Sequence, residues 1–248
     1  MKAMVLAAGQ GTRLRPATDS RPKALVPVAG RPMIDYALLL LRHYGIRDII
    51  INLHHFGEQI ENRLGDGRAL GLKISYSREQ ELLDTGGGLL QAKAFLQDGV
   101  FIVINTDALI DLNLAALIGF HMQRNAAATL VLRADERADE YGSMDIDPSG
   151  RICRFLDSKA PIKPDGAVRK LMFTGVQILD PKVFAYMADG GKTRKFSTTK
   201  HTYPRMLSNG ERLYGFPFDG FWQDLGTPAR IREAELKLQN GAARLHFL

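Results

Sequence analysis

The sequence has little cysteine, no long apolar run and no repeated or low-complexity segment. Cys153 is the single cysteine among 248 residues, which excludes an internal disulfide and a cysteine-based zinc site. The longest purely apolar stretch, residues 37–41, is far shorter than the roughly 18 residues that a membrane-spanning helix needs. These absences favour a protein of a reducing compartment without a membrane partner, so we expect a cytoplasmic location.

The amino-terminal segment has a short apolar run at residues 3–8, followed by Gly9, Gln10 and Gly11. A secretory signal needs an apolar core of about 7–15 residues, and this run is shorter. We therefore interpret it as a buried first strand.

The overall composition is that of a globular protein with an excess of positive charge. The chain is 45% hydrophobic, and its 33 basic and 27 acidic residues leave a formal charge of +6. This charge favours anionic partners. Nucleic acid, a membrane surface and a phosphorylated metabolite are the three alternatives. We find no helix-turn-helix, zinc finger or aromatic RNA-binding motif, so nucleic acid is not an expected partner.

Short apolar runs alternate with helical stretches in the first half of the chain. We expect strands at residues 3–7, 48–53, 73–77, 100–104 and 128–133, and helices at 32–44, 56–64, 88–95 and 113–124. This alternation predicts βαβ units, and hence an α/β fold with a Rossmann-like, mostly parallel sheet flanked by helices. His121, within the last of these helices, is expected at the surface.

After about residue 140 the pattern changes to a smaller mixed α+β region. We expect a hairpin of residues 144–147 and 151–156, strands at 175–179 and 212–218, and a final helix at 228–238. We predict a single domain, residues 1–248, with a nucleotide-binding half at 1–135 and a second half at 136–248.

Ligands of open parallel sheets bind at the carboxyl ends of the strands, and a glycine-rich loop follows the first strand. Gly9 and Gly11 allow backbone N–H groups to approach an anion closely. Arg13 adds a bidentate phosphate ligand, and Lys23 adds a compact charge. The loop therefore predicts a triphosphate site, although Leu14 stands where a dinucleotide fingerprint has its third glycine.

A second segment with unusual composition runs from Asp84 through Thr85 to three consecutive glycines, residues 86–88. One interpretation is the beginning of a helix with a tight turn. The other is a stretch of bare backbone on which a flat ligand such as a nucleobase lies.

Two carboxylates stand next to predicted elements, one after a strand and one before a helix. Asp107 comes directly after the strand at 100–104, and Asp224 stands before a glycine turn. Each alone is compatible with a cap or a turn residue. Together they would form the two-carboxylate site that Mg²⁺ uses when substrate phosphates supply its other ligands.

The run Gly9-Gln10-Gly11-Thr12-Arg13-Leu14, with Pro22-Lys23-Ala24-Leu25-Val26-Pro27, resembles the signature of the sugar-1-phosphate nucleotidyltransferases. The resemblance extends over nearly the whole chain, through Gly87, Asp107, residues 173–175 and residues 222–227. It implies transfer of a nucleotidyl group from an NTP to a sugar 1-phosphate with Mg²⁺ as cofactor.

Within that family the chain is similar to the short bacterial branch. We expect UTP and N-acetylmuramate 1-phosphate as substrates, with GTP and mannose 1-phosphate as the alternative. We also expect a monomer or homodimer, and none of the C-terminal β-helix that longer members append.

The resemblance also implies roles for individual residues. The residues with implied nucleotide-binding roles are Leu6, Ala8, Gly9, Gly11, Thr12, Arg13, Lys23, Glu79, Thr85, Gly86 and Gly87. Catalytic roles are implied for Arg13, Lys23 and Asp107, and Mg²⁺ binding for Asp107 and Asp224. The implied sugar-binding residues are Asp157, Lys159, Thr174 and Gly175. No general base is required, because the attacking sugar-phosphate oxygen is already anionic at neutral pH.

The sequence departs from the family pattern at two places. Thr106 stands where the family usually has glycine, and the Glu-Lys-Pro segment that reaches the sugar phosphate is replaced by residues 155–161. Lys159 is then the candidate for the sugar-phosphate lysine and Lys170 the alternative. These departures leave open a second hypothesis, a nucleotide-sugar sensor that binds without catalysis.

Overall fold

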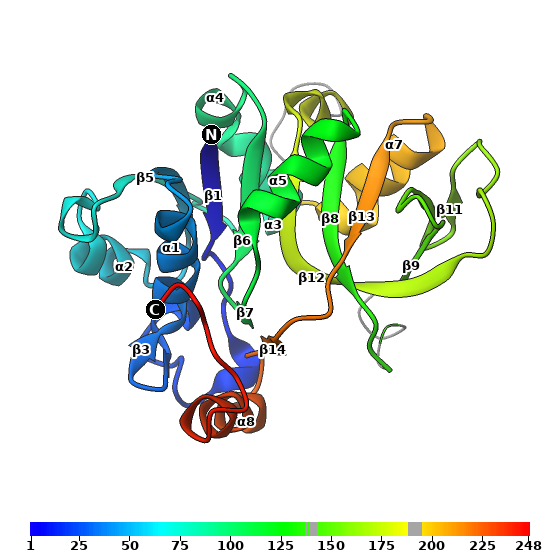
Figure 1. Cartoon of the computed structure of the whole chain (residues 1–248). Coiled ribbons are helices and arrows are strands. Elements are labelled where there is room, and N and C mark those ends of the chain that lie inside the picture. Colours follow the sequence, from blue (N-terminus) through cyan, green and yellow to red (C-terminus); the bar gives the residue numbers. More distant parts are fainter. Residues whose placement is uncertain (137, 139–142, 188–194) are drawn as a thin grey trace. The chain divides into compact units, whose positions relative to one another are not determined.

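The computed structural model describes residues 1–136, 138, 143–187 and 195–248, and its residues form two compact units. Unit 1 consists of Met1–Leu82, Ile104–Leu112 and Gly220–Leu248, and unit 2 of Leu83–Val103 and Asn113–Asp219 (Figure 1). These units differ from the expected halves because the chain leaves unit 1 at residue 83 and returns to it twice. The division at residue 135, which concerns substrate binding, stays a prediction.

Unit 1 contains a parallel sheet of three strands, β1 (Lys2–Leu6), β4 (Asp48–Leu53) and β5 (Lys73–Arg78). β4 lies between the other two, with Leu6 of β1 opposite Asn52 and Asn52 opposite Ser77 of β5. Residues 49–53 are all buried, as a continuous apolar run in a parallel sheet requires. The predicted first strand and its two parallel neighbours are confirmed.

Three helices belong to unit 1: α1 (Met33–His43), α2 (Gly57–Leu64) and α8 (Pro228–Gln239). α1 packs against β1, and α2 against β5 (Figure 1). Thr227 caps α8 by accepting the Arg230 amide on its hydroxyl, and Pro228 occupies the first turn. The three predicted helices are confirmed to within a few residues at each end.

Two short antiparallel ribbons complete unit 1. β2 (Pro27–Val28) pairs with β3 (Arg31–Pro32), and β7 (Ala108–Ile110) pairs with β14 (Trp222–Asp224). α8 packs on both β14 and β2. The second ribbon brings segments that are distant in sequence to adjacent positions, directly after β6 (Phe101–Asn105).

Unit 2 contains mostly antiparallel strands in the order β11-β10-β9-β12-β8-β13. They are β8 (Ala128–Arg133), β9 (Ser143–Ile146), β10 (Ile152–Phe155), β11 (Ser158–Lys159), β12 (Arg169–Leu179) and β13 (Leu213–Pro217). Only the β8–β13 pair is parallel among these. The expected hairpin and mixed α+β region are confirmed, and with them the α/β class.

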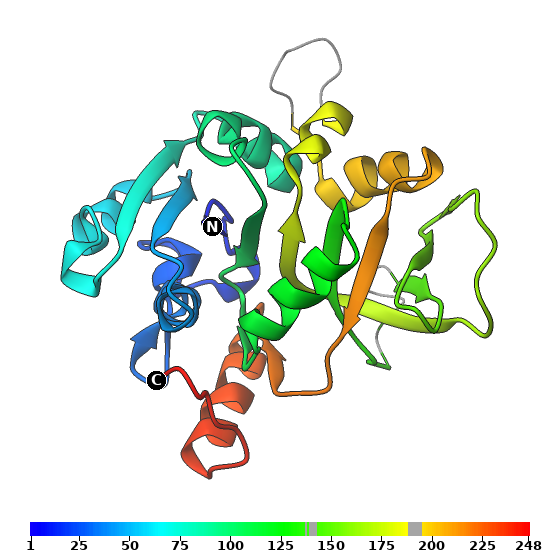
Figure 2. The same cartoon turned by 45° about the horizontal axis from the view of Figure 1, so that its top comes forward.

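In its described residues, unit 2 has the α-helices α3 (Asp84–Gln91), α4 (Lys93–Leu96), α5 (Leu114–Gln123) and α7 (Tyr203–Ser208). α5 packs on β8 and β13 (Figure 2). The helix expected at 88–95 begins earlier, at Asp84, and is interrupted at Ala92. None of the helices in the described part of the chain is long and apolar enough to cross a membrane.

The expectation that His121 lies at the surface is wrong. His121 is 2% exposed and shares the buried face of α5 with Leu114 and Leu117, because these positions recur at helical spacing. Its Nδ1 atom lies 2.9 Å from the Thr129 hydroxyl of β8. A polar residue on the inner face of the helix therefore has a polar partner in the strand.

Burial of His121 predicts a loss of stability in acid. Desolvation lowers the pKa of the imidazole to about 4 in the folded protein, whereas an unfolded histidine titrates near 6.5. The unfolded chain thus binds the extra proton first, so the free energy of unfolding falls as the pH drops from about 6.5 through 4. Urea titrations should show a loss of about 2 kcal/mol between about pH 7 and pH 4.5 from this residue. His121→Gln should remove that part of the pH dependence, and an identical dependence in both proteins would contradict it.

Candidate functional site

The loop after β1 is held in place by contacts within unit 1. The Ala7 amide donates to Asn52 Oδ1 at 2.8 Å, and the Thr18 hydroxyl donates to the Gly11 carbonyl at 2.9 Å. Gly11 has φ 65°, and a Cβ there would lie 2.9 Å from Lys23 Cβ and from Thr18 Cγ2. A side chain at this position would therefore meet both strain and contact, which explains the glycine.

The loop exposes its candidate phosphate ligands while its flanks are buried. Gly9, Thr12 and Arg13 are exposed, whereas Ala8 and Leu14 are buried. The Arg13 guanidinium lies against Gly226, where an added Cβ would be 2.9 Å from Arg13 Nη2. Arg13 thus extends from the first loop to the turn that follows β14.

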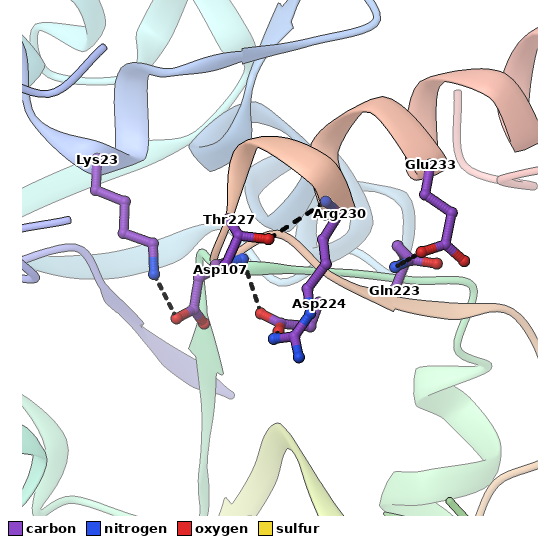
Figure 3. A network of polar contacts seen from close by, with 8 residues as sticks. Lys23, Asp107, Gln223, Asp224, Thr227, Arg230 and Glu233 are labelled. Carbon is purple, nitrogen blue, oxygen red and sulfur yellow. Dashed lines mark hydrogen bonds and ion pairs between the residues drawn. The ribbon is translucent and has the colours of Figure 1, made fainter. Parts of the chain in front are cut away.

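Lys23 and Asp107 form an ion pair. Lys23 Nζ lies 2.7 Å from Asp107 Oδ2, with 12% of the lysine side chain and 37% of the aspartate side chain exposed (Figure 3). Asp107 stands between β6 and β7, and its carbonyl accepts the Leu225 amide at 2.8 Å. This bond ties the backbone of Asp107 to the end of β14.

Asp224 is the last residue of β14 and stands opposite Ala108 in the ribbon. Its Oδ1 accepts the Gly226 amide at 2.8 Å, and its Oδ2 is ion-paired with Arg230 Nη1 (Figure 3). Asp107 immediately precedes β7, and Asp224 ends β14, so the two carboxylates stand at the same end of one ribbon. Their oxygen donors suit Mg²⁺, which needs one or two carboxylates when substrate phosphates complete its shell.

Thr106 is accommodated without disturbing the strand end. Its hydroxyl donates to the Leu6 carbonyl at 2.9 Å, and the residue is 5% exposed. The side chain that replaces the family's glycine thus connects the end of β6 to the end of β1, next to Asp107.

Glu79 follows β5 and is 5% exposed. Its Oε1 accepts a hydrogen bond from Asn52 Nδ2 at 2.7 Å, and Asn52 in turn holds the Ala7 amide. It also lines a cavity of about 370 Å³ together with His54, Phe56 and other residues of β4, α2 and β5. Glu79 therefore orients the Asn52 side chain, which in turn holds the backbone at the start of the first loop.

The glycine segment of unit 2 lies within a helix. Gly86 and Gly87 donate their amides to the Phe196 carbonyl at 2.8 and 3.3 Å, and Thr85 Oγ1 accepts the Thr198 amide at 3.0 Å. A Cβ on Gly86 would lie 2.2 Å from Phe196 Cε2. The close neighbour of this glycine is therefore a side chain of the same unit, rather than open space for a flat ligand.

Gly86→Ala is expected to destabilise the protein by about 1–3 kcal/mol, because the new methyl group meets the Phe196 ring and carbonyl. Gly119→Ala is the matched control, since Gly119 also lies in a helix but has nothing within 4 Å of an added Cβ. That control should be neutral or more stable by up to about 1 kcal/mol. Thermal unfolding of both variants measures the difference, and equal midpoints would contradict the prediction.

The structure does not bring the four candidate sugar ligands together. Thr174 is 3% exposed and donates its hydroxyl to the Val131 carbonyl at 2.9 Å, and Gly175 follows it in β12 with φ 94°. Lys159 lies on β11, which β10 and β9 separate from β12, and Asp157 lies in the turn before β11. Two intervening strands put Lys159 about 14 Å from β12 across the sheet. Lys170, the alternative lysine, is on β12 itself.

Three side-chain contacts at this site were not predicted from the sequence. Asn52 holds the first loop, the Thr106 hydroxyl joins two strand ends, and Arg230 pairs with Asp224. The polar Asn52 near the end of an otherwise apolar strand was a usable signal, because buried amides need partners. The pairing of Arg230 depends on how α8 packs against β14, for which the sequence carries no local signal.

Comparison with known proteins gives the same family over the whole fold. A family model described as nucleotidyl transferase matches residues 2–241. The chain is 33% identical to a UTP–glucose-1-phosphate uridylyltransferase of Synechocystis over 91% of this chain and 60% of the relative. It is 33% identical to a mannose-1-phosphate guanylyltransferase of Mycobacterium tuberculosis over 97% of this chain and 65% of the relative.

A third relative is similar in length. The N-acetylmuramate alpha-1-phosphate uridylyltransferase of Neisseria meningitidis is 35% identical over 95% of this chain and 97% of the relative. The chain thus spans less than two thirds of the first two relatives and nearly all of the third.

Solved structures share the fold. A Bacillus anthracis protein described as a glucose-1-phosphate thymidylyltransferase superposes with a TM-score of 0.81 at 24% identity, covering 95% of this chain and 94% of the other. HddC from Yersinia pseudotuberculosis, solved with GMP-PN, gives a TM-score of 0.75 at 23% identity over 96% and 99%. The matched family model, the three relatives and the fold agree, and the chain belongs to the nucleotidyl transferase family.

Proposed function

We propose that this protein transfers a nucleotidyl group from an NTP to a sugar 1-phosphate and releases pyrophosphate. The observation that carries the proposal is the arrangement of charges in unit 1. Asp107 immediately precedes β7, and Asp224 ends the paired strand β14. Lys23 lies beside Asp107, and Arg13 of the first loop lies beside Gly226. Carboxylates for a divalent cation next to cations for phosphates are what this reaction requires.

The side chains of unit 1 divide the work of binding the triphosphate. The loop of Gly9 to Arg13 offers backbone amides and a guanidinium to phosphate oxygens, and Lys23 adds a point charge. Asp107 and Asp224 would hold Mg²⁺, which supplies charge neutralisation at the phosphates when it is bound. Gly226, two residues after Asp224, leaves room for the Arg13 guanidinium beside the Asp224 carboxylate.

The chemical step needs positioning and charge rather than a base. An anionic oxygen of the sugar phosphate attacks the α-phosphorus of the NTP, and the bond from that phosphorus to the α–β bridging oxygen breaks. Pyrophosphate leaves with the electron pair, and no proton has to be removed from the nucleophile. Arg13 and Lys23 offset the repulsion between the two anions and the charge that develops on the leaving group.

For substrates, we propose UTP and N-acetylmuramate 1-phosphate, with GTP and mannose 1-phosphate as the alternative. The Neisseria uridylyltransferase supports the first pair because it matches this chain over 97% of its own length. The Mycobacterium guanylyltransferase supports the second pair at 33% identity. We propose Mg²⁺ as the cofactor on the strength of the paired carboxylates.

The test is pyrophosphate release with four NTPs against a panel of sugar 1-phosphates, with and without Mg²⁺. We expect turnover with one NTP and one sugar phosphate above the rest, and none after chelation of the metal. Absence of turnover with every pair would overturn the proposal. Calorimetric binding of a nucleotide sugar without turnover would instead identify a sensor.

A further inference from the structure

Arg230 forms an ion pair with Asp224, a carboxylate that the proposed function assigns to a divalent cation. It is the third residue of α8, and its Nη1 contacts Asp224 Oδ2 (Figure 3). Both side chains are largely buried, with 22% of the arginine and 11% of the aspartate exposed. This pair is therefore less screened by solvent than a surface ion pair.

The position of Arg230 is fixed by the packing of α8 on β14. Lys237 Nζ lies 2.9 Å from Gln223 Oε1 and 2.6 Å from Glu233 Oε1, so polar contacts join the helix to the residue preceding Asp224. The Thr227 hydroxyl caps the helix at the same end. With the helix held along its length, the guanidinium meets Asp224 from a preorganised position.

Cations from the chain itself thus contact both candidate metal ligands. Lys23 pairs with Asp107 as Arg230 pairs with Asp224, and Arg13 lies against Gly226 nearby. Two carboxylates and three cationic side chains leave this cluster with a net positive charge. Such a cluster repels a bare divalent cation and attracts a triphosphate.

We propose that Arg230 is a positioning residue that competes with the divalent cation for Asp224. It holds the carboxylate in place in the absence of ligand and makes free metal bind weakly. The incoming triphosphate compensates the charge of the displaced guanidinium, so the cation binds together with its nucleotide. The inference rests on the proposed function for the metal site at Asp224 and for the identity of that nucleotide.

The test measures Mn²⁺ binding to the nucleotide-free protein, with the free ion detected by electron paramagnetic resonance. Arg230→Gln should bind Mn²⁺ about 10-fold more tightly than the unchanged protein, because Asp224 loses its competing cation. Arg230→Lys should restore weak binding. Arg232→Gln, on the exposed side of the same helix, is the matched control and should bind as the unchanged protein does.

A second variant assigns the gain to Asp224. Adding Asp224→Asn to Arg230→Gln should abolish the tighter binding. Equal or weaker Mn²⁺ binding by Arg230→Gln, with circular dichroism unchanged, would overturn the inference, as would a gain that survives loss of Asp224. If Arg230→Gln does not fold, the Arg230→Lys variant decides. Tighter Mn²⁺ binding by Arg230→Lys than by the unchanged protein would then overturn the inference.

The metal-binding test and the turnover test can fail independently of each other. Tighter Mn²⁺ binding without pyrophosphate release from any substrate pair would leave this inference standing and remove the proposed function. Turnover by the unchanged protein, with equal Mn²⁺ affinity in Arg230→Gln, would support the proposed function and overturn this inference. With an active substrate pair, Arg230→Gln should lower the Mg²⁺ concentration needed for half-maximal activity, whatever its effect on kcat.

Discussion

Asp107→Ala is expected to lower turnover by about 10³-fold, the largest effect of any substitution predicted here. The change removes one of two carboxylates proposed to hold Mg²⁺ and also the partner of Lys23. Loss of several kcal/mol of charge stabilisation in the transition state corresponds to a rate loss of about this size. Pyrophosphate release at saturating substrate measures it.

Asp111→Asn is the matched control, since Asp111 lies just beyond β7 and accepts the His246 amide at 2.9 Å, away from the ion pair of Lys23. Its turnover should stay close to that of the unchanged protein. Nucleotide-sugar binding by Asp107→Ala should also persist in part, because the first loop keeps its ligands. Unchanged turnover in Asp107→Ala would remove Asp107 from the site.

Lys23→Ala is expected to lower turnover by about 10²–10³-fold, the usual effect of removing one preorganised donor from a developing negative charge. Lys23 is 12% exposed with its ammonium group 2.7 Å from Asp107, so its position is set before substrate arrives. Thermal stability should change by about 1 kcal/mol or less, because the Asp107 carboxylate left behind remains partly hydrated.

The control for this lysine is an ion pair of the same type elsewhere in unit 1. Lys73 Nζ lies 3.5 Å from Asp48 at the amino-terminal ends of β5 and β4, with 80% of the lysine side chain exposed. Lys73→Ala should therefore leave turnover unchanged. A loss in Lys73→Ala as large as that in Lys23→Ala would mean that net charge, and not position, governs the rate.

Local patterns in the sequence were sufficient for the three parallel strands and the three helices of unit 1, but not for its two short ribbons. Residues 48–53 are apolar without alternation, which requires burial on both faces, and the structure places them in the middle strand of the parallel sheet. Glycine-rich and basic composition after the first strand likewise located the loop at Gly9 to Arg13. These features depend on short-range sterics and on the burial of apolar side chains, both of which the sequence displays directly.

Side-chain partners that come from distant segments could not be derived in this way. His121 was expected at the surface, whereas it is buried and has Thr129 of the strand beneath as its polar partner. For Gly86 the sequence left a helix entry and a bare ligand surface as alternatives, and Phe196 of a distant segment covers it. Both differences arise from packing between elements, which periodicity does not report.

By itself, the sequence determined the α/β class and the place of the first loop, and it predicted the two carboxylates as metal ligands, because strand alternation and residue chemistry are local properties. Only the tertiary structure decided that β7 and β14 pair, which sets Asp107 beside the end of β14. The same pairing and the packing of α8 decided that Arg230 meets Asp224. The reason is physical: an ion pair forms where two backbone segments converge, and that convergence is a result of the whole fold.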